Sequence, residues 1–216
     1  MKNTSPDPHI SLAIAERYAS LAAGGGPLGC RTDVADAIAL RPGQSLLDVG
    51  CGRGGLLRAL AEKHPEAGRL AGVDASPAML AEAQRSRPDH RIEWVSGRIE
   101  ALPFADAAFD WVVCDCSFNH AEDPRGAAAE LYRVLKPGGT AVLAEPVTRE
   151  PLPAAIRQDP QARAACFGGC LTLPELEAVF RAVGFDVREA SPGRQYQKNG
   201  YDFTAALVRA RKGTPS

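Results

Sequence analysis

The sequence predicts an α/β fold, with a mostly parallel sheet of seven strands, helices on both faces and an antiparallel hairpin at the C-terminal end. Short apolar segments rich in β-branched residues alternate with segments of helical spacing between residues 45 and 145, which is typical of βα units around a parallel sheet. Two further strand-like segments close the chain, and a polar stretch with Gly193 and Gly200 joins them. The 216 residues, of which 45% are hydrophobic and 24% charged, suit one globular domain.

Individual elements follow from apolar spacing and from capping residues. Ser76-Pro77 and Asp123-Pro124 each place a good N-cap before a proline in the first helical turn. Strands are predicted at residues 45–49, 69–73, 91–95, 109–114, 140–145, 186–189 and 203–208. Helices are predicted at residues 10–22, 34–40 and 54–63, from residue 76 onward, and at residues 124–136 and 174–183.

Composition argues against several kinds of partner. A formal net charge of −1 gives no basic footprint for nucleic acid or for an anionic membrane surface. The apolar runs are far shorter than a membrane span, and the first ten residues lack the apolar core of a signal peptide. We therefore expect a cytoplasmic protein with no nucleic-acid or membrane partner, whose six cysteines are reduced.

A glycine-rich turn follows the first predicted strand of the α/β core. It has the spacing Asp48-x-Gly50-x-Gly52-x-Gly54, and the glycines let the backbone bend tightly and approach a ligand. An acidic residue at this place would repel a pyrophosphate and suits a ligand with an ammonium and a sulfonium group. Asp74 ends the second strand, where a carboxylate can accept both hydroxyls of a ribose. The competing interpretation is that both carboxylates only cap the next helix.

Four segments extend this pattern beyond the glycine turn. LLDVGCGRG, GVDASPAML, ALPFADAAFDWVV and AELYRVLKPGG occur in this order within residues 45–145, and they resemble the successive motifs of class I S-adenosylmethionine-dependent methyltransferases. Gly184-Phe185 also fits that family. The resemblance implies a Rossmann-like fold, S-adenosyl-L-methionine as cofactor and a small-molecule methyl acceptor. The glycine spacing also argues against an NAD-dependent enzyme.

The same resemblance assigns cofactor contacts by position. Gly50 and Gly52 would contact the methionine end, Asp48 its amino group and Asp74 the ribose. The family usually has Asp at the position of Arg98, so the contact with the adenine amine changes here, while the Ile99 backbone can still serve the ring. The expected cofactor-binding residues are Asp48, Gly50, Cys51, Gly52, Asp74, Ala75, Met79, Arg98, Ile99 and Asp115.

A narrower resemblance concerns the acceptor. FDWVVCDCSFNH and ACFGGCLT are similar to segments of arsenite methyltransferases, which implies metalloid-binding roles for Cys116 and Cys166. The sequence departs from that family after the glycine motif, where Leu56-Leu57 replaces a cysteine, and in lacking a longer C-terminal extension. Cys30 and Cys170 are further candidate metalloid ligands, and no resident metal is expected.

Several acceptors remain open at this stage. A soft acceptor such as trivalent arsenic needs thiolates and positioning rather than a strong base, whereas an oxygen acceptor needs a base such as His120 or Asp115. The expected catalytic residues are Cys116, Cys166 and His120, and Glu145 is a further candidate for orienting a substrate. The alternatives are O-, N- or C-methylation of a small metabolite, a protein that binds a metalloid or cofactor without catalysis, and cysteines that simply pack inside.

We expect one methyltransferase domain over residues 1–216, in an oligomeric state that the sequence does not give. Its expected parts are a disordered tail (1–9), an N-terminal helical cap (10–40), a cofactor-binding core (45–145), a cap or loop over the acceptor site (146–172), and a C-terminal helix with an edge hairpin (173–210).

Overall fold

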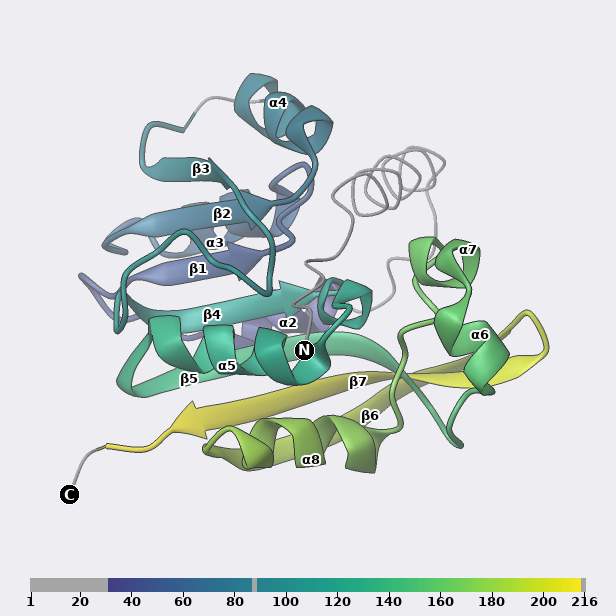
Figure 1. Cartoon of the computed structure of the whole chain (residues 1–216). Coiled ribbons are helices and arrows are strands. Elements are labelled where there is room, and N and C mark those ends of the chain that lie inside the picture. The colour runs from purple at the N-terminus through teal and green to yellow at the C-terminus, as the bar shows by residue number, and fades with distance from the viewer. Residues whose placement is uncertain (1–30, 87–88, 215–216) are drawn as a thin grey trace, which may run out of the picture.

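The computed structural model describes residues 31–86 and 89–214 and contains one seven-stranded sheet (Figure 1). The strand order is β3-β2-β1-β4-β5-β7-β6, with the first five strands parallel and the last two antiparallel. The predicted fold class is therefore confirmed. The strands are β1 (Leu46–Val49), β2 (Leu70–Asp74), β3 (Ile92–Ser96), β4 (Phe109–Asp115), β5 (Leu135–Thr148), β6 (Phe185–Lys198) and β7 (Tyr201–Lys212).

Helices cover both faces of this sheet, and each face has its own apolar core. Alternate residues of a strand point to opposite faces, so Leu46 and Leu47 belong to different clusters. One cluster packs against the helices α2 and α3, and the other against α5 and α8. The helices are α2 (Arg31–Ala37), α3 (Gly55–Lys63), α4 (Pro77–Arg85), η1 (Phe118–His120), α5 (Pro124–Val134), α6 (Ala154–Gln158), α7 (Pro160–Ala164) and α8 (Leu173–Ala182).

Capping residues begin the helices where the sequence predicts. The Ser76 side chain accepts a hydrogen bond from the Met79 backbone, and the Asp123 carboxylate accepts one from the Arg125 backbone. At α8, Thr172 and Glu175 form a capping box, in which each side chain bonds the other residue's backbone N–H. Prolines in the first turn of α4 and α5 fix the direction in which the chain leaves β2 and the β4 loop.

The C-terminal hairpin is much longer than the sequence predicts. The predicted strand 186–189 extends over Phe185–Lys198, and Gly193 lies inside it beside a bulge rather than in a loop. The turn consists of Asn199 and Gly200, both with positive φ (52° and 79°), as a two-residue hairpin turn requires. The outer strand is mostly exposed, so its sequence lacks the apolar alternation that would have predicted it.

Three further predictions differ from the structure. The helix predicted to end at Lys136 ends at Val134, and α2 ends at Ala37 rather than at Leu40. The segment 146–170, expected as a cap or loop, begins with the last residues of β5 and contains the short helices α6 and α7. The predicted helix at 10–22 and Cys30 lie outside the described residues.

A third apolar cluster attaches this segment to the hairpin rather than to the main core. It joins Leu152, Ala162, Phe167 and Cys170 to Phe203 of β7. The rings of Phe167 and Phe203 meet edge to face, with centroids 6.4 Å apart. The cluster places residues 165–170 beside η1, at the ends of the parallel strands.

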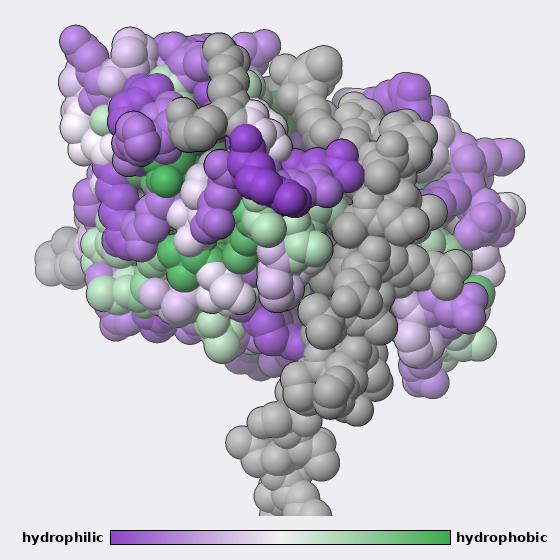
Figure 2. Space-filling model, turned by 90° about the horizontal axis from the view of Figure 1, so that it is seen from above, coloured by the Kyte–Doolittle hydropathy of each residue, from purple (hydrophilic) through white to green (hydrophobic). Residues whose placement is uncertain are grey.

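The molecular surface is mostly polar. Figure 2 looks down onto the molecule from above the view of Figure 1, and hydrophilic side chains cover most of that face around a smaller hydrophobic area. No helix in the described part of the chain is long and apolar enough to cross a bilayer.

Candidate active site

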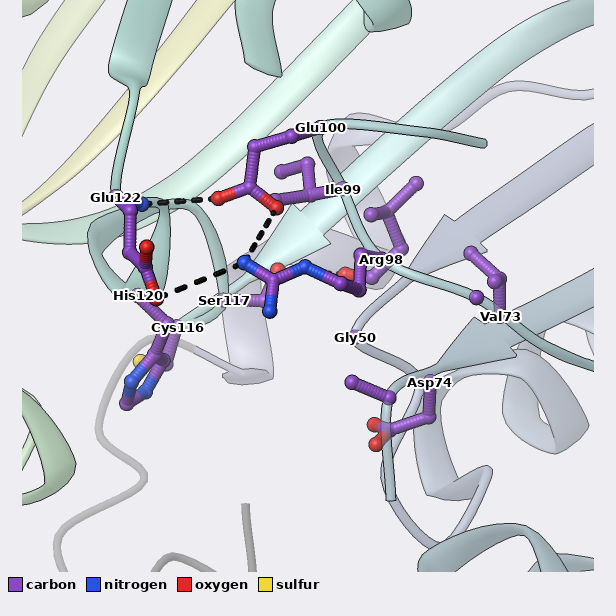
Figure 3. Close-up of a pocket in the computed structure, with 13 residues that line it drawn as sticks. Gly50, Val73, Asp74, Arg98, Ile99, Glu100, Cys116, Ser117, His120 and Glu122 are labelled. Atoms are coloured by element: carbon purple, nitrogen blue, oxygen red, sulfur yellow. Dashed lines mark hydrogen bonds and ion pairs between the residues drawn. The ribbon is translucent and has the colours of Figure 1, made fainter. Parts of the chain in front are cut away.

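A cavity opens where the parallel strands β1, β2, β3 and β4 end (Figure 3). This is the edge at which open α/β sheets bind their ligands. Backbone turns, apolar side chains and charged groups all contribute to its wall. The lining residues are Val49, Gly50, Val73, Asp74, Ala75, Gly97, Arg98, Ile99, Glu100, Cys116, Ser117, His120 and Glu122.

The glycine turn after β1 forms one side of the cavity. Gly50 has φ 73°, and a Cβ there would lie 2.3 Å from the Cβ of Ser117, so only glycine fits. Ser117 is itself fixed, because its hydroxyl donates to the Val49 carbonyl at 2.5 Å. Gly52 also has a positive φ, but a Cβ there would meet nothing within 4 Å. The turn is therefore crowded by Ser117 at Gly50, whereas it has open space beside Gly52.

Asp74 joins the glycine turn to the start of α4. Its Oδ2 accepts the Gly52 N–H at 2.8 Å, and its Oδ1 accepts the Ser76 N–H at 2.8 Å. Burial raises the pKa of this carboxyl, and the two backbone N–H groups oppose that rise. Asp74 is therefore not the cap of α4, which is Ser76, but it holds the backbone of that cap residue and also lines the cavity. Each oxygen still has a second lone pair for a ligand hydroxyl.

The other residues expected to bind the cofactor divide into two groups. Gly50, Ala75, Arg98 and Ile99 line the cavity together with Asp74. The remaining five do not belong to the lining, although they surround it. Asp48 is only 2% exposed, Met79 is buried in α4, and Cys51 is buried with a pKa raised by desolvation. The rest of this group are Gly52 and Asp115.

Charged side chains form a cluster on the wall beside Ile99. An Arg98 guanidinium nitrogen lies 3.4 Å from a Glu100 carboxylate oxygen and 3.6 Å from a Glu122 carboxylate oxygen. The Glu122 N–H donates to the other oxygen of Glu100 at 2.9 Å. Figure 3 shows how these contacts connect the loop after β3 to the loop after β4.

The charge balance of the cavity fits a positively charged ligand. Three carboxylates, from Asp74, Glu100 and Glu122, line it against the single guanidinium of Arg98. Burial lowers the pKa of His120 to about 4, with smaller contributions from the nearby charges of Arg163 and Lys198, so this imidazole is neutral at pH 7. The wall thus suits S-adenosylmethionine, whose ammonium and sulfonium groups are cationic and whose ribose needs acceptors.

Cys116 and His120 lie on the side of the cavity after β4, and Cys166 contacts His120 without itself belonging to the lining. Cys116 and His120 both line it, and Nε2 of His120 lies 3.1 Å from Sγ of Cys166. Burial raises the pKa of the Cys166 thiol to about 12; the Glu145 carboxylate adds to the rise, and the Lys198 ammonium opposes it. Cys116 and Cys166 have φ angles of 54° and 58°, a conformation that is uncommon for residues other than glycine.

The other candidate thiols lie elsewhere. Cys170 is fully buried; its sulfur accepts an Asn119 side-chain N–H at 3.3 Å, and it does not line the cavity. Cys30 falls outside the described residues. Among residues 31–86 and 89–214, no three His, Cys, Asp or Glu side chains are grouped to hold a metal ion.

Glu145 has a role that the sequence did not identify. Its side chain is buried, and Oε1 accepts the backbone N–H groups of Ser117 and Phe118 at 2.8 and 2.7 Å. It therefore holds the loop after β4 in place and does not line the cavity. Ser117, Glu100 and Glu122 are lining residues that sequence reasoning missed. The only signal for them was their closeness in sequence to Arg98 and His120.

Known proteins share both the sequence motifs and the fold. Residues 47–143 match the family model described as a methyltransferase domain. An arsenite methyltransferase from Halobacterium salinarum is 32% identical over 168 residues, which cover 76% of this chain and 43% of that protein. A demethylmenaquinone methyltransferase from Renibacterium salmoninarum is 41% identical over 113 residues, which cover 52% of this chain and 45% of that protein. The chain thus spans less than half the length of these two relatives.

A solved structure agrees at the level of the fold. The arsenic(III) S-adenosylmethionine methyltransferase from Chlamydomonas reinhardtii has a TM-score of 0.67 and 23% identity, covering 92% of this chain and 74% of that chain. The matched domain spans the strands whose ends form the cavity. Residues 47–143 therefore form a methyltransferase domain.

Proposed function

We propose that this chain transfers a methyl group from S-adenosylmethionine to a small thiophilic acceptor, trivalent arsenic, bound as a thiolate by Cys116 and Cys166. The observation that carries the proposal is the contact between Cys166 and His120. Because His120 and Cys116 line the same cavity, this contact brings a thiol from the segment after α7 to the wall that already holds a thiol from the β4 loop.

Backbone strain supports this assignment of the two cysteines. Only four non-glycine residues in the described part of the chain have positive φ, and Cys116 and Cys166 are two of them. A left-handed conformation costs such a residue on the order of 1–3 kcal/mol, and residues of this kind gather at functional sites.

The sequence likeness does not depend on the kind of acceptor. The match to the arsenite methyltransferase covers 168 residues and so reaches beyond the cofactor domain at 47–143. A 24-methylenesterol C-methyltransferase from Oryza sativa matches over 163 residues at the same identity of 32%. The proposal of arsenic therefore rests on the contact of Cys166 with His120 and on the backbone strain at the two cysteines.

In this proposal, one side of the cavity binds the cofactor and the other side binds the methyl acceptor. The glycine turn and Asp74 bind the cofactor, which supplies an electrophilic methyl group on a sulfonium when it is bound. Arsenite exchanges two of its three hydroxyls for the sulfurs of Cys116 and Cys166, and each hydroxyl leaves as water with one thiol proton, while His120 holds the Cys166 sulfur in place. The bound cofactor would supply its methyl carbon to the arsenic lone pair and keep the electron pair of the carbon–sulfur bond as a thioether. The positive charge would pass to arsenic, whose remaining hydroxyl would then lose its proton to water.

The segment 146–172 acts as the cap of the acceptor site in this proposal. Leu152, which precedes α6, and Ala162 of α7 belong to the same apolar cluster as Phe203 of the hairpin. The Arg163 guanidinium also donates to the Ala121 carbonyl at 2.9 Å, which ties α7 to the β4 loop. The cap therefore carries Cys166 to the position where it contacts His120.

Arsenite binding and turnover test the proposal in one series of variants. The full chain is incubated with arsenite, S-adenosylmethionine and a small thiol, and S-adenosylhomocysteine and methylated arsenic are quantified. We expect C116S and C166S to lose arsenite binding in calorimetry and to lose turnover. C170S is the matched control, since Cys170 bonds Asn119 away from the cavity, and we expect it to keep both once its folding is verified.

The same measurements distinguish the competing functions. Unchanged arsenite affinity in both C116S and C166S would reject the metalloid role and leave a small organic acceptor. That alternative has support in the neutral imidazole of His120, which could serve as a base on the cavity wall. Arsenite binding without any S-adenosylhomocysteine would indicate a binding protein without catalysis.

A further inference from the structure

The charged cluster of Arg98, Glu100 and Glu122 lies beside the part of the cavity that suits the adenine ring. Asp74 ends β2 and offers acceptors to a ribose. A base attached to that ribose extends toward Ala75 and the loop after β3, where Ile99 also lines the wall. These two apolar side chains can cover the faces of a purine. The polar edge of the purine must then find its partners among the charged residues of the same loop.

The exocyclic amine of adenine donates two hydrogen bonds and accepts none. The guanidinium of Arg98 also only donates, so it cannot bind this amine directly. It is instead directed toward carboxylates, with Glu100 at 3.4 Å and Glu122 at 3.6 Å. Among the charged side chains of this cluster, the two carboxylates are therefore the groups that can accept from the amine.

The contacts of the two carboxylates distinguish them. One oxygen of Glu100 accepts the Glu122 N–H and the other faces the Arg98 guanidinium, so both serve to hold the two loops together. Glu100 is also the more buried of the two, with its side chain 18% exposed against 31% for Glu122. The Glu122 carboxylate has the longer contact with Arg98, and the link between the loops runs through the Glu122 backbone N–H rather than through this carboxylate.

We propose that Glu122 accepts the exocyclic amine of the adenine ring and that Arg98 is the positioning residue that directs the Glu122 carboxylate to it. Glu122 follows His120 by two positions in the β4 loop. Recognition of the base thereby comes from the loop that also forms the acceptor side of the cavity. The proposal concerns cofactor recognition and does not depend on the identity of the methyl acceptor.

Two ligands that differ along one edge of the base provide the test. S-adenosylhomocysteine has a 6-amino group that donates and an N1 that accepts, whereas S-inosylhomocysteine has a 6-oxo group that accepts and an N1–H that donates. Calorimetry on the full chain gives both dissociation constants and needs no methyl acceptor. Because hydrogen bonds to a charged partner are strong, we expect the wild type to prefer the adenosyl ligand about 10-fold to 100-fold.

Variants at three positions separate the roles of the two residues. E122A should reduce the preference to the part that N1 contributes, and E122Q should reduce it further or reverse it, because an amide can donate to the 6-oxo group. R98A should weaken the preference by freeing the Glu122 carboxylate, and R98K should restore part of it. E82Q is the matched control, since Glu82 pairs with Arg53 on α4 and does not line the cavity; it should bind both ligands as the wild type does.

Clear outcomes would overturn this inference. It fails if folded E122A keeps the wild-type preference for the 6-amino ligand, or if the wild type has no preference. It also fails if E100A removes the preference in a folded protein that still contains Glu122, while E122A does not. Loss of arsenite turnover has no bearing on either result, so this proposal and the proposed acceptor can fail separately.

Discussion

The imidazole Nε2 of His120 lies 3.1 Å from the Sγ of Cys166, although the two residues are 46 positions apart in the sequence. One residue ends the 3₁₀ helix after β4, and the other follows α7. The contact makes the two segments part of one site, and its burial shifts the pKa of both groups away from their ordinary values. The shifts determine how stability depends on pH and how the Cys166 thiol reacts.

Stability should fall on acidification because of His120. Its pKa is lowered from 6.5 to about 4 by burial and by nearby positive charges. Between these two values the unfolded chain binds a proton that the folded chain does not, so the free energy of unfolding decreases as the pH falls. The full loss is about 3 kcal/mol below pH 4. Urea denaturation from pH 7 to pH 4 measures the slope, and H120N should flatten it; an equal slope in H120N contradicts the assignment.

Removing the charge of Glu145 and removing that of Lys198 should change the reactivity of the Cys166 thiol in opposite directions. The Glu145 carboxylate raises the pKa of the thiol, and the Lys198 ammonium lowers it. We therefore expect E145Q to increase the rate of Cys166 alkylation at pH 9 and K198M to decrease it, since only the thiolate reacts. Mass spectrometry of iodoacetamide-treated protein follows the site. Shifts in the same direction for both variants would show that a change in exposure, rather than charge, governs the thiol.

Substitution of Asp74 should weaken cofactor binding more than it weakens the fold. D74A removes the acceptors for the ribose and leaves the N–H groups of Gly52 and Ser76 without this partner. We expect the affinity for S-adenosylhomocysteine to fall about 10-fold to 100-fold, as the loss of charged hydrogen bonds predicts. Asp110, whose carboxylate pairs with Lys136 away from the cavity, gives the control D110N. Equal losses of affinity in the two variants would argue against a direct contact.

Two alanine substitutions in the same glycine turn should lower the free energy of unfolding by different amounts. G50A combines a positive φ with a Cβ only 2.3 Å from the Cβ of Ser117, whereas G52A has the positive φ without a clash. We expect G52A to lose about 1–2 kcal/mol of unfolding free energy and G50A about 2–4 kcal/mol. Urea denaturation measures both. The double variant G50A/S117G should regain part of the loss, and no recovery would mean that the clash is not the cause.

Buried features of this fold could be predicted from the sequence, and exposed ones could not. Strands β1, β2 and β4 are packed on both faces, so their apolar residues appear as short continuous runs. The glycine turn and Asp74 were found because a ligand-binding turn restricts residue type at fixed spacing. In contrast, β6 is an exposed edge strand with many polar residues, and its length depends on pairing with β7 that no local pattern reveals.

Some residues of the candidate site could also be predicted from the sequence, whereas others could not. Ala75 could be placed on the cavity because it directly follows β2 within a recognised motif, and Ile99 because it lies in the loop after the third predicted strand. The contact of Cys166 with His120 depends on how the hairpin supports α7, and that support involves residues far apart in the sequence. The part played by Glu122 depends on an ion pair across two loops. Such relations arise only after the chain has folded.

The cap has its own apolar support on the hairpin, separate from the two clusters that hold the central sheet. A small, independent cluster loses less burial when it opens than a central strand does, so it can open at a lower free energy than the whole domain. Opening would carry Cys166 away from His120 while Asp74 and the glycine turn keep their bonds. An acceptor could thus enter and a product leave while the nucleoside stays bound, and changes in the cap could alter the choice of acceptor without disturbing the cofactor pocket.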